Sequence, residues 1–295
     1  MEKSKVYFTK KLSPETVVKM YEHLGITLPG RVAVKVHSGE EGNQNYLHPE
    51  FMKPMVEYVH GTVVETNTAY GGARSTSAGH LKLLKSHGWS EYFDVDLMDE
   101  TGPDAVLEIP DGKVLKKDVV GKDLLKYDSM LVLAHFKGHP MGGYGGALKQ
   151  LSIGCASSTG KALIHSGGKD TNPGSCWKHH ASKEGFTEAM ADAASAVYRH
   201  FEGGIAFVSM MCNLSVDCDC CSDAEDPCMR DIGTLSSLDP VALDKACMDL
   251  IDAATDDPGQ KHFLERVESR HGRHTIEAAA ALGFGTTDYE LICVD

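Results

Sequence analysis

Short apolar runs alternate with amphipathic segments along the first third of the chain. Residues 31–37 (RVAVKVH) alternate apolar and polar positions and are rich in Val, which predicts a strand, and residues 62–65 predict the next one. Ser13-Pro14-Glu15 is typical of a helix start, because Ser caps the helix and Pro fits its first turn, and His48-Pro49-Glu50 is predicted to start a second helix. A further helix is predicted over residues 75–87. This order favours parallel strands joined by crossover helices.

The middle of the chain breaks this rhythm. Residues 105–109 and 113–119 flank Asp111-Gly112, which predicts a tight antiparallel hairpin within a sub-lobe at residues 95–125. The apolar runs 129–134 and 205–211 are typical of buried parallel strands. Further elements are predicted as strands at 5–8 and 289–294 and as helices at 184–200, 240–253, 259–270 and 275–282.

The predicted fold class is therefore α/β, with a mostly parallel sheet, crossover helices and a small antiparallel hairpin insertion. No internal repeat or low-complexity linker divides the chain. We expect one intertwined domain over residues 1–295.

Charge excludes two classes of partner. The 295 residues carry a net charge of -13, with 42 acidic against 29 basic side chains, which argues against nucleic acid and against a polybasic membrane contact. No apolar run approaches the ~20 residues of a membrane helix, and the charged N-terminus lacks a signal-peptide core. We expect a cytoplasmic protein with reduced thiols and a small-molecule ligand; a homodimer is compatible with the sequence.

Five of the nine cysteines are crowded into residues 212–228, interleaved with aspartates. Thiolates are soft ligands for zinc, copper(I) and iron–sulfur clusters, but the spacing contains neither paired C-x-x-C motifs nor a ferredoxin run. Two interpretations stay open: a metal or iron–sulfur centre, or buried or redox-reactive thiols. The candidate metal ligands are Cys218, Cys220, Cys155 and Cys228.

Histidines follow two of the predicted strands. His135, Lys137 and His139 come after the run at 129–134, and His37 ends the strand at 31–37. Ligands of open α/β sheets bind beyond the carboxyl ends of the strands, and histidine is a common acid, base or metal ligand. These four residues are the candidate catalytic groups; a structural hydrogen-bonding role is the alternative for each histidine.

Glycines and cations supply candidate substrate contacts. Gly145 and Gly146 allow a ligand to approach the backbone, and the following helix would offer free N–H groups to an anion. Lys149 would add a positive charge to this contact. Asn67, Tyr70 and Arg74 follow the strand at 62–65, and a guanidinium suits a carboxylate or phosphate. A mobile glycine loop and ordinary capping chemistry are the alternatives.

One further segment comes close to a nucleotide-binding motif. Residues 154–161 (GCASSTGK) approximate a Walker A loop, but the glycine spacing is one residue too long, and Ala162 stands where Ser or Thr would hold Mg²⁺. ATP hydrolysis is therefore not predicted.

Several long motifs together carry a family resemblance. They are KVHSGEEGN (35–43), ETNTAYGGARS (65–75), AHFKGHPMGGYGGALKQLSIGCASSTGK (134–161), VDCDC (216–220), DIGTLSSLDPVALDKA (231–246) and RHGRHTIEAAAALGFG (270–285). With them the chain resembles domain-of-unknown-function family 362, often labelled uncharacterised iron–sulfur centre proteins. Many relatives carry a ferredoxin-like insertion after the stretch matching residues 161–166. Here residues 166–185 keep only Cys176 and His179-His180, so a ferredoxin-type double cluster is not expected.

Three functions follow as hypotheses. The first is a redox enzyme that depends on a metal ion or iron–sulfur cluster and acts on a small anionic molecule. The second is a metal-free isomerase, lyase or transferase that uses the same His, Lys and Arg groups. The third is a non-catalytic protein that binds a metal or cluster.

Overall fold

A single large sheet organises the structure, a computed structural model that describes residues 3–295. Its strands are β1 (Ser4–Thr9), β2 (Val32–Lys35), β3 (Thr62–Glu65), β4 (Val95–Leu97), β7 (Ser129–His135), β10 (Ile205–Met211), β11 (Gly233–Ser237) and β12 (Tyr289–Cys293). They lie in the order β12-β1-β11-β10-β7-β2-β3-β4. The block from β4 to β10 is parallel throughout, and only β11 runs antiparallel to its neighbours. The predicted α/β class is confirmed.

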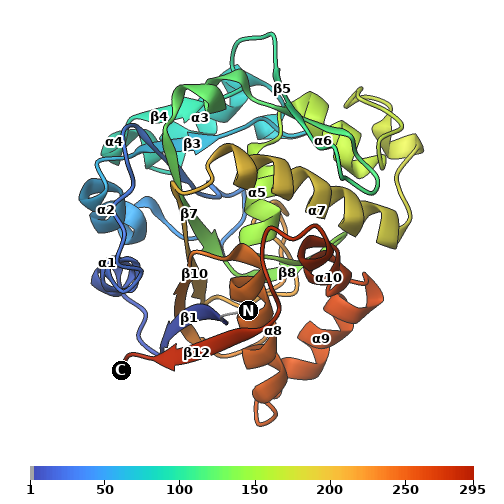
Figure 1. Cartoon of the computed structure of the whole chain (residues 1–295). Coiled ribbons are helices and arrows are strands. Elements are labelled where there is room, and N and C mark those ends of the chain that lie inside the picture. Colours follow the sequence, from blue (N-terminus) through green and yellow to red (C-terminus); the bar gives the residue numbers. More distant parts are fainter. Residues whose placement is uncertain (1–2) are drawn as a thin grey trace.

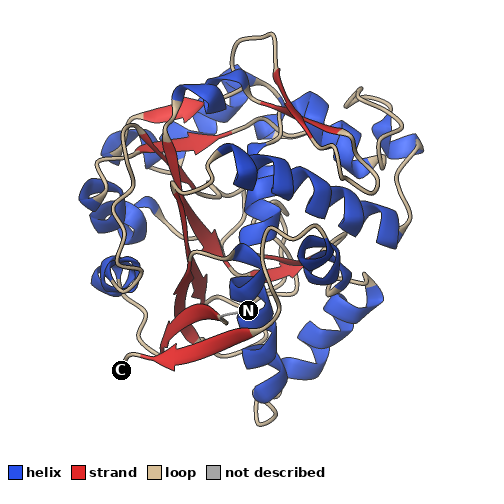
Figure 2. Ribbon diagram, viewed as in Figure 1, coloured by secondary structure: helices blue, strands red, loops and turns tan. Residues whose placement is uncertain are grey.

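Helices cover both faces of this sheet (Figures 1 and 2). One face packs against α1 (Pro14–Glu22), α2 (Pro49–Tyr58), α3 (Ser77–Ser86) and α4 (Trp89–Tyr92). The other packs against a group that includes α5 (Ala147–Cys155), α7 (Lys183–His200), α8 (Pro240–Ala253), α9 (Gln260–Ser269) and α10 (His274–Ala281), with α6 (Ser158–His165) beside α7. Short 3₁₀ turns are η1 (Ala73–Ser75), η2 (Lys122–Lys126) and η3 (Cys176–Lys178). Among residues 3–295, no helix has the length and apolar character needed to cross a bilayer.

The central strands are apolar on both sides because both sides are covered. Leu131 and Leu133 of β7 belong to the core under α1 and α2, whereas Met130 and Val132 belong to the core under α5 and α7. All four side chains are fully buried. A continuous apolar run, rather than an alternating one, is what a parallel strand between two helical layers requires.

Strand β11 is, with the edge strand β4, one of two strands of the large sheet that the apolar pattern did not predict. Its sequence, GTLSS, is polar, yet all five residues are buried. The hydroxyls of Thr234, Ser236 and Ser237 each donate a hydrogen bond to a backbone carbonyl within residues 5–20, at 2.6–2.9 Å. A polar strand is therefore buried without unpaired groups, which hydrophobic periodicity cannot reveal.

The predicted antiparallel hairpin insertion is confirmed, but the prediction of a tight turn at Asp111-Gly112 is wrong. Strands β5 (Ala105–Glu108) and β6 (Lys117–Val120) pair as expected, and the paired residues stop well short of Asp111-Gly112. The intervening loop instead folds against α7. There the buried Asp192 carboxylate accepts the backbone N–H groups of residues 113–115, at 2.6–2.8 Å.

Replacing Asp192 with Ala should destabilise the protein, because several backbone donors of the loop lose their acceptor. We expect a loss of about 2–3 kcal/mol in the free energy of unfolding, measured with urea. Asp111→Ala is the matched control, since it removes an exposed carboxylate that pairs with Arg199, and should cost under about 1 kcal/mol. Equal losses in the two variants would contradict this account of the loop.

Candidate functional site

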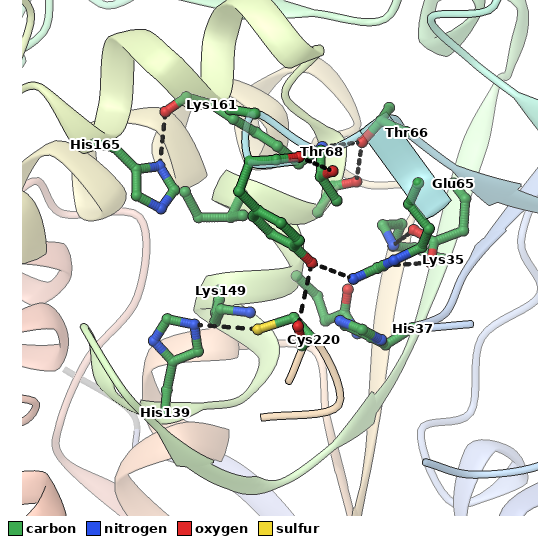
Figure 3. Close-up of a pocket in the computed structure, with 16 residues that line it drawn as sticks. Lys35, His37, Glu65, Thr66, Thr68, His139, Lys149, Lys161, His165 and Cys220 are labelled. Atoms are coloured by element: carbon green, nitrogen blue, oxygen red, sulfur yellow. Dashed lines mark hydrogen bonds and ion pairs between the residues drawn. The ribbon is translucent and has the colours of Figure 1, made fainter. Parts of the chain in front are cut away.

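The carboxyl ends of β2, β3 and β7 open onto a small, mostly enclosed cavity of about 60 Å³ (Figure 3). We call it the inner chamber; its walls include His37, Tyr70, His139, Lys161, His165 and Cys220. Parallel strands present their loops at one edge, so residues far apart in sequence meet there. The chamber thus brings together part of the set predicted from strand ends, including His37 and His139.

Two cysteines and a histidine converge at one wall. Donor atoms of His139, Cys218 and Cys220 all lie within 4.8 Å of one another, close enough to hold one metal ion. The Lys149 Nζ lies 3.5 Å from Cys218 Sγ, and His139 Nε2 lies 3.9 Å from Cys220 Sγ. Cys218 is fully buried, whereas Cys220 is half-buried and borders the chamber.

The pKa values of the two thiols are shifted in opposite directions. Burial raises the pKa of Cys218, but the Cys220 thiol, the Lys149 ammonium and His139 outweigh this effect and hold that pKa well below its usual value. The pKa of Cys220 is raised well above the usual value by its hydrogen bonds with Cys218 and Cys221 and by burial. These opposite shifts favour a thiolate on Cys218 over one on Cys220.

Asp219, between the two cysteines, fixes their loop. Its buried carboxylate accepts hydrogen bonds from Lys137 Nζ at 2.7 Å and His135 Nδ1 at 3.0 Å. Burial would raise the pKa of Asp219, but these two groups hold it well below its usual value. His135 Nε2 in turn donates to the Cys212 carbonyl at 2.6 Å. Lys137 and His135, predicted as catalytic residues, thus use their polar atoms to position the loop, and neither borders the chamber.

The proton positions of His139 and His37 follow from their backbone contacts. His139 lies at the end of β8 (Lys137–His139), which pairs with β9 (Gly143–Gly145), and its Nδ1 accepts the backbone N–H groups of residues 141 and 142, at 3.2 and 2.8 Å. His37 Nδ1 accepts from the Gly39 N–H at 3.2 Å. Burial lowers both pKa values to about 4. Each ring is then neutral at pH 7 with its proton on Nε2, the nitrogen available to the sulfurs.

His165 has the opposite tautomer and was not predicted from the sequence. Its Nδ1 lies 2.7 Å from the Lys161 carbonyl, which can only accept, so Nδ1 carries the proton and Nε2 carries a lone pair. Burial lowers the pKa of His165 to about 3. The helical position of this residue gave no sign that it borders the chamber.

Cations outnumber anions around the chamber. Its walls contain the charged groups of Lys35, Arg74, Lys149 and Lys161, against a single carboxylate, Glu65. Lys35 pairs with Glu65 at 2.6 Å, and Arg74 pairs with Glu40 at 3.1 Å. The excess of positive charge therefore rests on Lys149, which lies 3.5 Å from Cys218 Sγ, and on Lys161. This local excess arises in a chain whose net charge is -13.

Three of the predicted substrate contacts border the chamber. They are Tyr70, Arg74 and Lys149; the Arg74 guanidinium also donates to the Tyr70 hydroxyl and pairs with Glu40. Asn67 lies outside its walls, with its amide bound to Ser77 and facing His80.

The glycine loop does not offer free amides to an anion, contrary to expectation. The first N–H groups of α5, at Ala147 and Leu148, donate to the buried Asp244 carboxylate at 2.8 and 3.0 Å. A Cβ on Gly146 would lie 2.5 Å from an oxygen of that carboxylate, so this glycine makes room for Asp244. Gly145 packs against the stems of Lys149 and Lys137.

Two of the four predicted metal ligands lie elsewhere. Cys155 is buried and its thiol faces the Gln150 carbonyl at 3.5 Å, while the Cys228 thiol faces the Leu214 carbonyl at 3.4 Å. Within the described residues, the His/Cys cluster contains only two cysteines. An iron–sulfur cluster held by four cysteines therefore has no preformed site there.

Comparison with known families agrees with the resemblance seen in the motifs. Residues 32–249 match the family described as "Domain of unknown function (DUF362)". The chain belongs to this family. No curated protein matches it significantly.

Two solved structures are similar to this DUF362 member. One is the lactate racemase apoprotein from Thermoanaerobacterium thermosaccharolyticum, with 14% identity, a TM-score of 0.44 and coverage of 70% of this chain and 50% of that one. The other is a Thermotoga maritima protein from a structural genomics consortium, with 13% identity, a TM-score of 0.44 and coverage of 91% and 58%. The chain thus spans about half the length of these proteins, and likenesses this weak support no statement about function.

The histidine tautomers give a direct test of the site geometry. Nitrogen-15 NMR at pH 7 should show His37 and His139 protonated on Nε2, and His165 protonated on Nδ1. Replacing each histidine in turn assigns the signals. A His139 ring protonated on Nδ1 in the metal-free protein would contradict the backbone contacts described above.

Proposed function

We propose that this protein is a metal-dependent enzyme that acts on a small anionic molecule. Cys218 and Cys220 would hold a soft metal ion, with His139 as a third ligand. The observation that carries the proposal is the convergence of these three donors within 4.8 Å, at the wall of a chamber rich in cations.

The chemistry of the donor set fits such an ion. Thiolate and imidazole ligands suit zinc and other borderline or soft metals, and two cysteines with one histidine leave a coordination position open in catalytic zinc sites. Because Cys220 and His139 border the chamber, an ion that they held would lie beside the space for the ligand. When bound, the ion would supply Lewis acidity to a substrate oxygen.

Other residues of the chain would bind and orient the substrate. Lys149 and Arg74 would attract the anionic group, and Lys149 also stabilises the Cys218 thiolate. His165 is suited to accept a hydrogen bond from the ligand through Nε2, because Nδ1 is fixed on a carbonyl; its pKa of about 3 does not suit a general base. A redox reaction, as expected from the sequence, stays a prediction.

A metal-free thiol enzyme is a second candidate, favoured by the contacts of His139. A neutral imidazole that binds a metal through Nε2 carries its proton on Nδ1, yet here Nδ1 accepts two backbone N–H groups. His139 would have to lose these contacts or bind as imidazolate. Without a metal, the thiolate of the Cys218–Cys220 pair would be the nucleophile, and Cys220 is the residue of the pair that borders the chamber.

Zinc titration of anaerobically prepared, metal-free protein separates the two candidates. For the metal enzyme we expect one tight zinc site per chain, with an affinity at least about a hundredfold lower in Cys218→Ser and in Cys220→Ser. Loss of a residue that only hydrogen-bonds to a metal ligand already lowers metal affinity up to about a hundredfold, and loss of a ligand itself should cost at least as much. Cys228→Ser, which changes a cysteine outside the cluster, should bind like the parent.

The opposite result would overturn the metal proposal. The metal proposal fails if the parent protein has no tight zinc site, or if Cys218→Ser, Cys220→Ser and Cys228→Ser bind zinc with equal affinity. Rapid alkylation of Cys220 by iodoacetamide in the same preparation would then support the thiol enzyme.

A further inference from the structure

A second cavity adjoins the inner chamber. This outer pocket has a volume of about 440 Å³ and a wide opening, and Tyr70, His139, His165 and Cys220 border both cavities. The shared walls make the two cavities neighbours, with the half-buried Cys220 at the boundary. A ligand that contacts the sulfur cluster can therefore extend into the outer pocket.

The two cavities differ in size and polarity. The inner chamber, at about 60 Å³, has room for on the order of five water-sized groups, which suits a carboxylate or another compact oxyanion. The outer pocket adds Pro140, Met141 and Trp177 and contains none of the four cationic side chains of the inner chamber. Its size falls in the range of small-molecule sites, and its lining suits an apolar group.

Trp177 is held in place as a preformed wall of the outer pocket. Its Nε1 donates to the Ala69 carbonyl at 3.1 Å, and its ring lies edge-on to His165 with centroids 5.0 Å apart. The preceding Cys176 is buried in a small cluster with Ala69 and Ala162. The indole is nevertheless 36% exposed, so an apolar ligand group could cover it.

We infer that the ligand is an amphipathic anion. Its compact anionic group would lie in the inner chamber near Lys149 and Arg74, and an apolar group of about the size of a phenyl ring would lie against Met141 and Trp177. The inference rests on the proposed function in one respect: it takes the inner chamber as the place where the anion binds.

Calorimetry with three probes tests this on the metal-free protein. We expect 3-phenylpropionate to bind about tenfold or more tightly than acetate, because the phenyl group is removed from water. The neutral 3-phenyl-1-propanol should bind at least tenfold more weakly than 3-phenylpropionate. Equal affinities for acetate and 3-phenylpropionate, or no binding of either anion, would overturn the inference.

Variants assign the effect to the outer pocket. Trp177→Ala should remove most of the advantage of 3-phenylpropionate and leave acetate binding unchanged. Met141→Ser should reduce the same advantage, so a folding defect in one variant does not decide the result. Tyr92→Ala is the control, since Tyr92 is an exposed aromatic residue of α4 outside both cavities. An unchanged preference in both pocket variants would overturn the assignment.

These measurements do not depend on a metal ion. If the phenyl preference is found but Cys218 and Cys220 bind no metal, the metal proposal fails and the ligand inference stands. If zinc binds as proposed but the phenyl group adds no affinity, the ligand inference alone fails.

Discussion

The buried carboxylate of Asp219 is the constraint on which the site depends. A charge removed from water is costly unless ionic partners and hydrogen bonds compensate, and here Lys137 and His135 supply both. Because Asp219 lies between Cys218 and Cys220, the same contacts that compensate its charge also fix the backbone that carries the sulfurs. The Glu40 N–H, bound to the Asp219 carbonyl at 2.8 Å, adds a further attachment.

The rest of the site is arranged around that fixed loop. Strand β7 ends at His135 and continues into β8, so one segment supplies both the partners of Asp219 and the imidazole of His139. Helix α5 brings Lys149 to Cys218, and its start is held by Asp244. The Asp219 carboxylate thus faces Lys137 and His135, while the Cys218 sulfur faces Lys149. Such a network is stable only if each buried charge keeps its partners.

Local patterns predicted the fold better than the site. Strands β3 and β10 and helix α8 lie at the predicted residues, because each combines a clear apolar pattern with turn or capping residues at its ends. Strand β11 and the loop at 109–116 depend on hydroxyls and on Asp192, which satisfy backbone groups of distant segments. At the site, the strand-end rule found His37 and His139, and cysteine crowding found Cys218 and Cys220. The same rules could not show that His135 binds Asp219 and does not border the chamber. They also could not place His165, whose position depends on how α6 packs.

Cobalt(II) titration of the parent protein and of Asp219→Asn tests most directly whether Asp219 positions the two sulfurs. Both proteins keep Cys218, Cys220 and His139, so they differ only in the charge that holds the loop. We predict intense near-ultraviolet thiolate-to-cobalt absorption in the parent, and a weak spectrum with at least tenfold lower affinity in the variant. Circular dichroism would verify that the variant is folded. A folded Asp219→Asn protein with the parent's spectrum and affinity would contradict the account.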